Sequence, residues 1–181
     1  MKFIICFLYS IVLCSCLTNY PANKEINISY KIQGMENWCW ANVSSMIYNY
    51  FYNQKTEDCE IASLYYKKYD CCAGDIKCNE TIHIKNMIKL LENELGVKTE
   101  LIYNPISFYK IVKNIHRDNL IIIIGLNSYN GHVYLISGYD KIKKRIIMID
   151  PNIGKLVMSY SVSINSSFMG NWYWTIIVKK K

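Results

Sequence analysis

The hydrophobic pattern of this 181-residue chain changes its period near the middle, and this change limits the folds it can adopt. Apolar residues recur at helical spacing over 39–53, 59–68 and 84–95, and Gly96 ends the last of these predicted helices. Beyond Gly96 the apolar runs are short and favour strands. Helices first and strands later predict an α+β fold with an antiparallel sheet.

The second half carries most of the predicted sheet. We expect strands over 97–103, 120–126, 132–138, 145–149, 155–158 and 172–178, with a helix over 107–116. A hydrophobic share of 51% and a charged share of 19% are typical of one globular domain, which we place at residues 31–181. The formal charge of +7 gathers at 141–145 and at the lysine tail 179–181. These segments resemble a hairpin tip and a chain end, so we expect solvated charge and no nucleic-acid partner.

Residues 1–17 are predicted to be a targeting segment, followed by a polar tether at 18–30. Lys2 precedes an apolar run that is too short to span a bilayer. Leu13-Cys14-Ser15-Cys16 resembles a bacterial lipobox, which implies membrane attachment through a lipidated Cys16. An ordinary signal peptide cut near Ser15 is the alternative. In both cases we expect a secreted protein or a cell-envelope lipoprotein, in which disulfides are permitted.

Cys39 lies between Trp38 and Trp40 in the first turn of a predicted helix. The free backbone amides and the helix dipole at this point favour an anion, and a thiolate is a nucleophilic anion. Gln33 lies six residues earlier, and its side-chain amide could donate to an oxyanion above the sulfur together with the Cys39 amide. The alternative is a buried cysteine packed between aromatic rings.

His132 is the predicted base among the three histidines of the chain. It begins a strand directly after Gly131, whereas His83 and His116 lie at helix ends and are expected to be exposed. A nucleophilic cysteine needs an imidazole that holds the thiol as thiolate and later protonates the leaving amine.

Asp150 is the predicted partner of this imidazole. If the turn at 139–144 is centred on Lys141, His132 faces Asp150 on the neighbouring strand, about 5 Å away. Asp140 is the rival carboxylate, but it lies at the turn, far along the strand from His132. The alternative for Asp150 is that it only caps the turn before the next residue, a proline.

Gln33 followed by Trp38-Cys39-Trp40-Ala41 resembles the active-site stretch of papain-like cysteine peptidases. This order of residues most resembles compact bacterial groups, namely the bacteriocin-leader peptidases and the secreted papain-like effectors of plant pathogens. The resemblance covers residues 33–151. It implies a two-lobed fold in which an N-terminal helical lobe packs its nucleophile helix on a C-terminal antiparallel sheet.

The resemblance also implies a role for each candidate side chain. Cys39 would be the nucleophile, His132 the general base and acid, Asp150 the orienter and Gln33 the oxyanion donor. Three features depart from papain. The gap from cysteine to histidine is 93 residues and therefore shorter, the orienter is Asp where papain has Asn, and Asn37-Trp38 replace Gly-Ser before the cysteine.

We therefore expect a monomeric cysteine peptidase that cleaves peptide or protein substrates through an acyl-enzyme, without a cofactor or metal. A thiol amidase or acyltransferase acting on a non-protein amide is one alternative. A non-catalytic surface binding module on the same scaffold is another.

Four further cysteines, Cys59, Cys71, Cys72 and Cys78, are candidates for two disulfides. Bridging the adjacent Cys71 and Cys72 would strain the backbone, so two pairings stay open. These are Cys59–Cys71 with Cys72–Cys78, and Cys59–Cys72 with Cys71–Cys78. A zinc site formed by the four is a weaker alternative, because the Cys-x-x-Cys spacing that usually accompanies such sites is missing.

Overall fold

The computed structural model describes residues 20–126, 131–166 and 169–181. The predicted targeting segment 1–17, with Cys16, and the first two tether residues lie outside this part of the chain. Within it, none of the helices is both long enough and apolar enough to cross a membrane.

The first half of the described chain is helical, as the hydrophobic period predicts. It contains α2 (Cys39–Tyr52), α3 (Asp58–Tyr66) and α4 (Ile84–Lys89). The helix predicted over 84–95 is only partly α-helical, because α4 ends at Lys89 and continues as a π-helical turn, Leu90–Glu94. Gly96 follows with φ +67°, a left-handed conformation that glycine adopts without steric cost.

The second half forms one antiparallel sheet in the order β2-β8-β3-β4-β5-β6. Its strands are β2 (Val97–Ile102), β3 (Leu120–Leu126), β4 (Gly131–Asp140), β5 (Arg145–Asp150), β6 (Gly154–Ser159) and β8 (Gly170–Lys180). The α+β prediction is therefore confirmed. Several short elements of the described chain were not predicted. They are β1 (Asn23–Glu25), which pairs with β4, the 3₁₀ turns Cys71–Ala73 and Ile76–Cys78, α6 (Tyr160–Ile164) and β7 (Asn165–Ser166).

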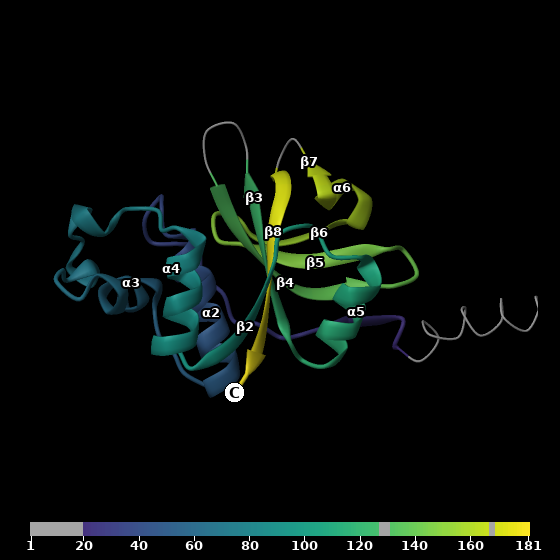
Figure 1. The fold of residues 1–181 in the computed structure, drawn as a ribbon, viewed down its shortest axis with the longest axis horizontal. Helices are drawn as coiled ribbons and strands as arrows, with labels where there is room; N and C mark the ends of the chain where they lie inside the picture. The colour runs from purple at the N-terminus through teal and green to yellow at the C-terminus, as the bar shows by residue number, and fades with distance from the viewer. Residues whose placement is uncertain (1–19, 127–130, 167–168) are drawn as a thin grey trace, which may run out of the picture.

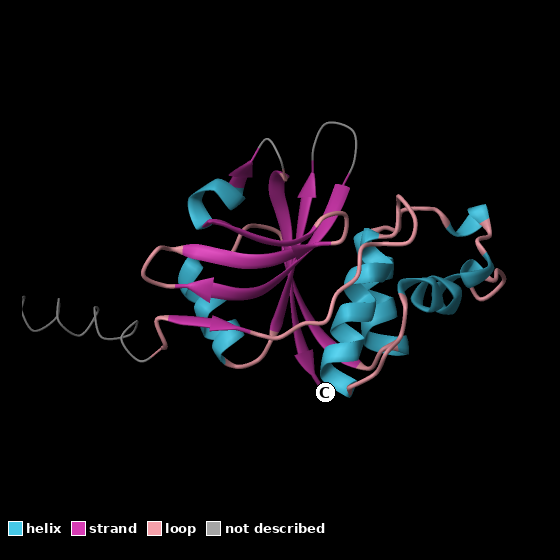
Figure 2. Ribbon diagram, turned by 180° about the vertical axis from the view of Figure 1, so that it is seen from behind, coloured by secondary structure: helices cyan, strands magenta, loops and turns pink. Residues whose placement is uncertain are grey.

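The helices α2, α3 and α4 gather beside the sheet, and the strands with α5 (Phe108–His116) and α6 form the other part of the molecule (Figure 1). α2 packs against β4, and α5 packs against β3 and β4. The four isoleucines 121–124 are buried between these elements. Figure 2 shows the loop that joins β1 to α2 running from the sheet to the helices. This loop carries Gln33 to the junction of the two parts.

Two disulfides tie the segment after α3. Cys59 pairs with Cys72, and Cys71 pairs with Cys78. The second of the two pairings left open by the sequence is therefore confirmed. The zinc alternative is wrong, because all four sulfurs are engaged in disulfides.

Candidate active site

Cys39 is the first residue of α2 and is almost completely buried. Among the described residues it is the one cysteine outside a disulfide. The residue before it, Trp38, occupies the N-cap position and makes no capping hydrogen bond through its side chain. The amides of the first turn therefore have no side-chain acceptor from the cap. They point toward the N-terminus of the helix, where Cys39 lies.

His132 lies near the start of β4, where α2 packs against the sheet. Its Nε2 lies 2.8 Å from Oδ1 of Asp150, and its imidazole also hydrogen-bonds the Cys39 side chain. Because Nε2 faces the carboxylate, Nδ1 is the ring nitrogen that is left to face the sulfur. The His132 side chain is 22% exposed and the Asp150 side chain 5%, so the carboxylate is the more deeply buried partner of this pair.

The surroundings of His132 keep its imidazole protonated over a wide pH range. Burial alone lowers the pKa of His132, because it penalises the cation. The hydrogen bonds to Asp150 and Cys39, together with the negative charges of both groups, outweigh burial. They raise the pKa of His132 from 6.5 to about 9. A cationic imidazole beside a sulfur is the arrangement that stabilises a thiolate.

Asp150 lies at the end of β5 and is buried. Its Oδ1 accepts a hydrogen bond from the amide of Asn152 at 2.8 Å, as well as facing the imidazole. The capping alternative from the sequence is thus also present, and one oxygen serves both contacts. This shared role fixes the carboxylate, and the carboxylate in turn limits rotation of the imidazole.

The predicted hairpin register is wrong by two residues along β4, although the side-chain contact that it predicted is present. Leu135 pairs with Ile149, and continuing this register places Asp150 opposite Tyr134. The difference begins at the turn, which occupies residues 141–144 and so is centred beyond Lys141, with Asp140 opposite Arg145. A bulge at Ser137 then moves the ladder by one residue, since Ile136 and the residue after Ser137 pair with consecutive residues of β5. His132 and Asp150 are therefore diagonal neighbours, a separation that long side chains bridge.

Tyr134 is a residue of the site that the sequence reasoning missed. Its ring meets the His132 ring edge-on, with centroids 4.6 Å apart, and it is buried. Burial, with the nearby charges of Asp150 and Cys39, raises the pKa of Tyr134, so its hydroxyl stays protonated. The signal was present in the sequence, because residues two apart on a strand share a face.

Gln33 lies in the loop between β1 and α2, where its backbone amide donates to the carbonyl of Pro151 at 2.9 Å. Its Nε2 donates to the carbonyls of Met35 (2.8 Å) and Glu36 (2.6 Å), and its Oε1 is buried without a hydrogen-bond partner. Both side-chain N–H groups are thus engaged in bracing the turn before Cys39. Donation to an oxyanion requires one of these bonds to be exchanged.

The remaining histidines lie where the sequence placed them. His83 and His116 are exposed, and His83 caps α4 by accepting the amide of Lys85 at its Nδ1. Asp140, the rival carboxylate, accepts from the amide of Lys143 within the hairpin turn. No group of three or more His, Cys, Asp or Glu side chains that could hold a metal ion occurs in the described part of the chain.

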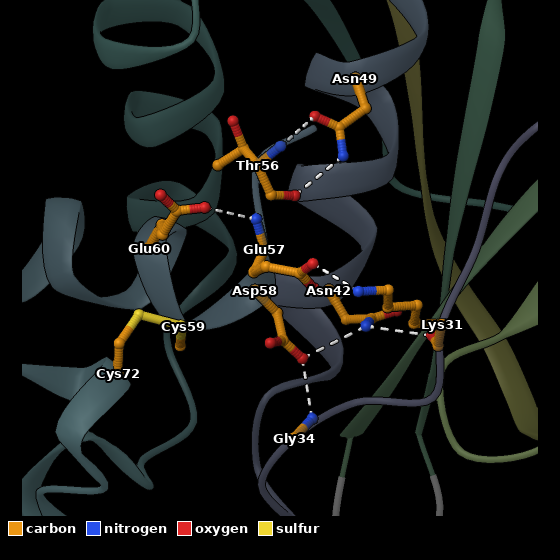
Figure 3. A network of polar contacts seen from close by, with 10 residues as sticks. All are labelled: Lys31, Gly34, Asn42, Asn49, Thr56, Glu57, Asp58, Cys59, Glu60 and Cys72. Atoms are coloured by element: carbon orange, nitrogen blue, oxygen red, sulfur yellow. Dashed lines mark hydrogen bonds and ion pairs between the residues drawn. A yellow bond between two sulfur atoms is a disulfide. The ribbon is translucent and has the colours of Figure 1, made fainter. Parts of the chain in front are cut away.

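A cavity of about 470 Å³ lies between the arm 27–32, one side of α2 and the segment 53–58. The side chains of Lys31 and Glu57 form an ion pair, and both line this cavity (Figure 3). Its lining does not include Cys39. The cavity is therefore separate from the cysteine–histidine pair.

Comparison with known proteins places the chain in a family. Residues 22–168 match the family model described as papain-like cysteine protease AvrRpt2. No curated protein sequence matches the chain.

Three solved structures illustrate the fold. The peptidase domain of Streptococcus ComA, a bi-functional ABC transporter involved in a quorum sensing pathway, has a TM-score of 0.58 at 15% identity, covering 84% of this chain and 100% of that chain. A C39-like peptidase from Bacillus anthracis has a TM-score of 0.59 at 12% identity, with coverages of 87% and 99%. Xylellain, a cysteine protease from Xylella fastidiosa, has a TM-score of 0.58 at 13% identity, with coverages of 92% and 89%.

At these identities the three structures show the fold alone, and that fold is the expected one, with the helix that carries Cys39 packed on an antiparallel sheet. The resemblance read from residues 33–41 is confirmed by the family match, which spans most of the chain. The chain therefore belongs to the papain-like cysteine protease AvrRpt2 family and is a cysteine peptidase.

Proposed function

We propose that this peptidase hydrolyses peptide bonds with Cys39 as nucleophile, His132 as general base and acid, and Asp150 as orienter. One observation supports the assignment above all others. A single imidazole hydrogen-bonds the Cys39 side chain and the Asp150 carboxylate at the same time. A base that contacts a nucleophile and is itself oriented by a third group is the geometric signature of nucleophilic catalysis.

The reaction begins with the ion pair of thiolate and imidazolium. The Cys39 sulfur attacks the carbonyl carbon of the substrate, and the negative charge moves to the carbonyl oxygen. The Cys39 amide and the Gln33 side chain donate to this oxyanion in our proposal. When the C–N bond breaks, the proton on Nδ1 of His132 passes to the leaving amine, and a thioester to Cys39 remains.

Hydrolysis of the thioester restores the starting state. Neutral His132 takes a proton from water at Nδ1, and the resulting hydroxide attacks the thioester carbonyl. The C–S bond breaks, and the Cys39 thiolate leaves beside the imidazolium. Throughout both steps the Asp150 carboxylate accepts from Nε2–H, which keeps Nδ1 directed at the reacting atoms and stabilises the cation.

The location of the enzyme is a second part of the proposal. We infer that it acts outside the cytoplasm as a monomer, either secreted or held in the cell envelope through a lipidated Cys16. The leader-like residues 1–17 support export, and two disulfides are typical of proteins from oxidising compartments. In cells that express the full chain, Cys16→Ala should move the protein from the envelope to the medium. A protein retained in the cytoplasm with an unprocessed N-terminus would overturn the export proposal.

Cleavage of a peptide library by the purified enzyme tests the chemistry. Wild-type protein should cut a subset of peptides, and Cys39→Ala should cut none while keeping its circular dichroism spectrum. His83→Ala serves as the matched control, because His83 is an exposed histidine at a helix end and should leave cleavage unchanged. Retained hydrolysis by folded Cys39→Ala protein would remove Cys39 from the mechanism.

A further inference from the structure

The residues that flank Cys39 are held by a loop about forty positions later in the chain. The indole N–H of Trp38 donates to the carbonyl of Cys78 at 2.6 Å, and that of Trp40 donates to the carbonyl of Glu80 at 3.0 Å. Both indoles are 2% exposed. Two buried donors on either side of Cys39 are thus satisfied by one segment, which we call the clamp loop, residues 70–80.

The same loop also binds Asn37, through its backbone amide and through its side-chain amide. The amide of Asn37 donates to Oδ1 of Asn79, and Nδ2 of Asn37 donates to the carbonyl of Asn79, each at 3.0 Å. The backbone of Asn37 is therefore fixed by a side chain, and that side chain belongs to the clamp loop. Three consecutive carbonyls of the loop, those of residues 78–80, accept hydrogen bonds from residues 37–40.

These contacts matter because α2 makes no side-chain capping hydrogen bond of its own at its N-terminus. A helix start without a cap frays, and its first amides then lose a defined direction. In this structure the clamp loop holds that start from outside. The position of the Cys39 sulfur and of its backbone amide relative to His132 therefore depends on the loop.

The loop has little regular structure with which to hold its own shape. It consists of two single-turn 3₁₀ helices, Cys71–Ala73 and Ile76–Cys78, capped by the side chains of Asp70 and Asp75. The Cys71–Cys78 disulfide closes it, and both of these cysteines are buried. One of its sulfurs belongs to the residue whose carbonyl binds Trp38.

The second disulfide has a different position. Figure 3 shows this bond between Cys59, near the start of α3, and Cys72. Cys59 is partly exposed and Cys72 is exposed, so the bond lies at the surface. The start of α3 is also stabilised independently, by a capping box between Glu57 and Glu60. Loss of the Cys59–Cys72 bond therefore leaves the contacts to residues 37–40 in place.

We propose that the clamp loop positions the nucleophile, with Asn79 and the buried Cys71–Cys78 disulfide as its positioning residues. The inference rests on the proposed function, since it takes Cys39 as the nucleophile. Catalysis then needs two redox states at once, a reduced Cys39 and an oxidised Cys71–Cys78 bond. A dithiol that reduces this bond gives up two electrons and two protons, forms two thiols at 71 and 78 and becomes a disulfide itself.

Two double serine variants distinguish positioning of Cys39 by the clamp loop from a general stabilisation of the fold by disulfides. Cys71→Ser with Cys78→Ser removes the buried disulfide, and Cys59→Ser with Cys72→Ser is the matched control at the surface. The readouts are kcat and KM on one peptide and, independently of turnover, the rate at which iodoacetamide alkylates Cys39 across a pH series. Peptide mass mapping assigns the label to Cys39.

Single substitutions keep the test valid if the buried pair of serines prevents folding. Asn79→Ala removes the acceptor for the Asn37 amide, and Asn79→Asp keeps an oxygen there. The control is Asn49→Ala, because Asn49 exchanges two equally short hydrogen bonds with the backbone of Thr56, farther along α2 (Figure 3).

We expect loss of the buried disulfide, or Asn79→Ala, to lower kcat by roughly ten- to a hundredfold, with a smaller change in KM. The alkylation rate of Cys39 near neutral pH should fall with it, and Asn79→Asp should recover most of both losses. The surface pair and Asn49→Ala should stay within about threefold of wild type. Equal losses from both disulfide pairs, or a wild-type kcat and alkylation profile in Asn79→Ala, would overturn the clamp. If no peptide is cleaved even by wild type, the proposed function fails, and the alkylation profiles still decide whether the loop positions Cys39.

Discussion

Gln33 braces the turn before Cys39 with the same N–H groups that an oxyanion would use. Its Nε2 donates to two loop carbonyls, and its backbone amide binds the segment that follows Asp150. The observed role of the side chain in holding the turn must therefore be separated from its proposed role in the reaction. A substitution distinguishes them, because a brace affects stability and an oxyanion donor affects the transition state.

If Gln33 donates to the oxyanion, Gln33→Ala should lower kcat by about 10²- to 10³-fold with little change in KM. Gln54→Ala is the control, since Nε2 of Gln54 also donates to a backbone carbonyl but lies on the surface after α2. Steady-state kinetics with thermal unfolding of both variants would settle the role. A Gln33→Ala enzyme that is less stable but has a wild-type kcat would limit Gln33 to bracing the turn.

At the scale of elements, the hairpin of β4 and β5 assembles half of the site. It brings the second residue of β4 to the last residue of β5, so that Nε2 of His132 lies 2.8 Å from Oδ1 of Asp150. The other carboxylate of the hairpin, Asp140, pairs with Arg145 across the turn and caps it. The geometry of the hairpin thus assigns different tasks to two aspartates ten residues apart.

We predict that Asp150→Ala lowers kcat by roughly 10²- to 10⁴-fold yet leaves measurable activity, because Cys39, His132 and the oxyanion donors remain. Asp140→Ala should stay within about twofold of wild type. The measurement is kcat for both variants on one peptide, with circular dichroism as the check on folding. A crippled Asp140→Ala enzyme beside an active Asp150→Ala enzyme would remove Asp150 from the mechanism.

Elements with a strong period could be predicted from the sequence, and contacts between distant segments could not. The spacing of apolar residues gave α2, and the isoleucine run gave β3 with its observed bounds. The hairpin was predicted with the contact of His132 and Asp150 but not with its register, because a lysine-rich turn does not show which of its residues is the centre. The bulge at Ser137 leaves no mark in the hydrophobic alternation either. The hydrogen bonds from Trp38 and Trp40 to the carbonyls of Cys78 and Glu80 join segments forty residues apart, and no local sequence pattern predicts them.

At the scale of the whole molecule, both disulfides lie among the helices, whereas the sheet has its own core of isoleucines. The helical part of the chain is thus the part whose stability depends on oxidation. Its second disulfide, Cys59–Cys72, closes a separation of 13 residues at the surface. Loop closure of this size contributes on the order of 2–3 kcal/mol to the free energy of unfolding.

We predict that Cys59→Ser with Cys72→Ser lowers the melting temperature by roughly 4–12 °C while leaving kcat near wild type. The result would show stability and activity depending on different disulfides of one lobe. Scanning calorimetry beside peptide kinetics makes the comparison. An unchanged melting temperature would mean that the surface bond does not stabilise the folded state.

The pH dependence of the enzyme follows from the network around His132. Its pKa is raised from 6.5 to about 9 in the folded protein, so the protonated form is the one that folding favours. The stability contributed by His132 is therefore fully present below pH 6.5 and is lost as the pH rises through about 9. In the proposed mechanism the same imidazolium protonates the leaving amine, so peptide cleavage should decline over the same upper range.

The pH profile of kcat/KM for one peptide tests the central assignment most directly, because it reports the ionisations of the free enzyme. The cysteine–histidine–aspartate network predicts a descending limb near pH 9 in wild type. Asp150→Asn should move that limb to lower pH, since one of the two hydrogen bonds that oppose burial is then weakened. A wild-type profile that already declines near pH 6.5, or a limb that Asp150→Asn leaves in place, would contradict the account.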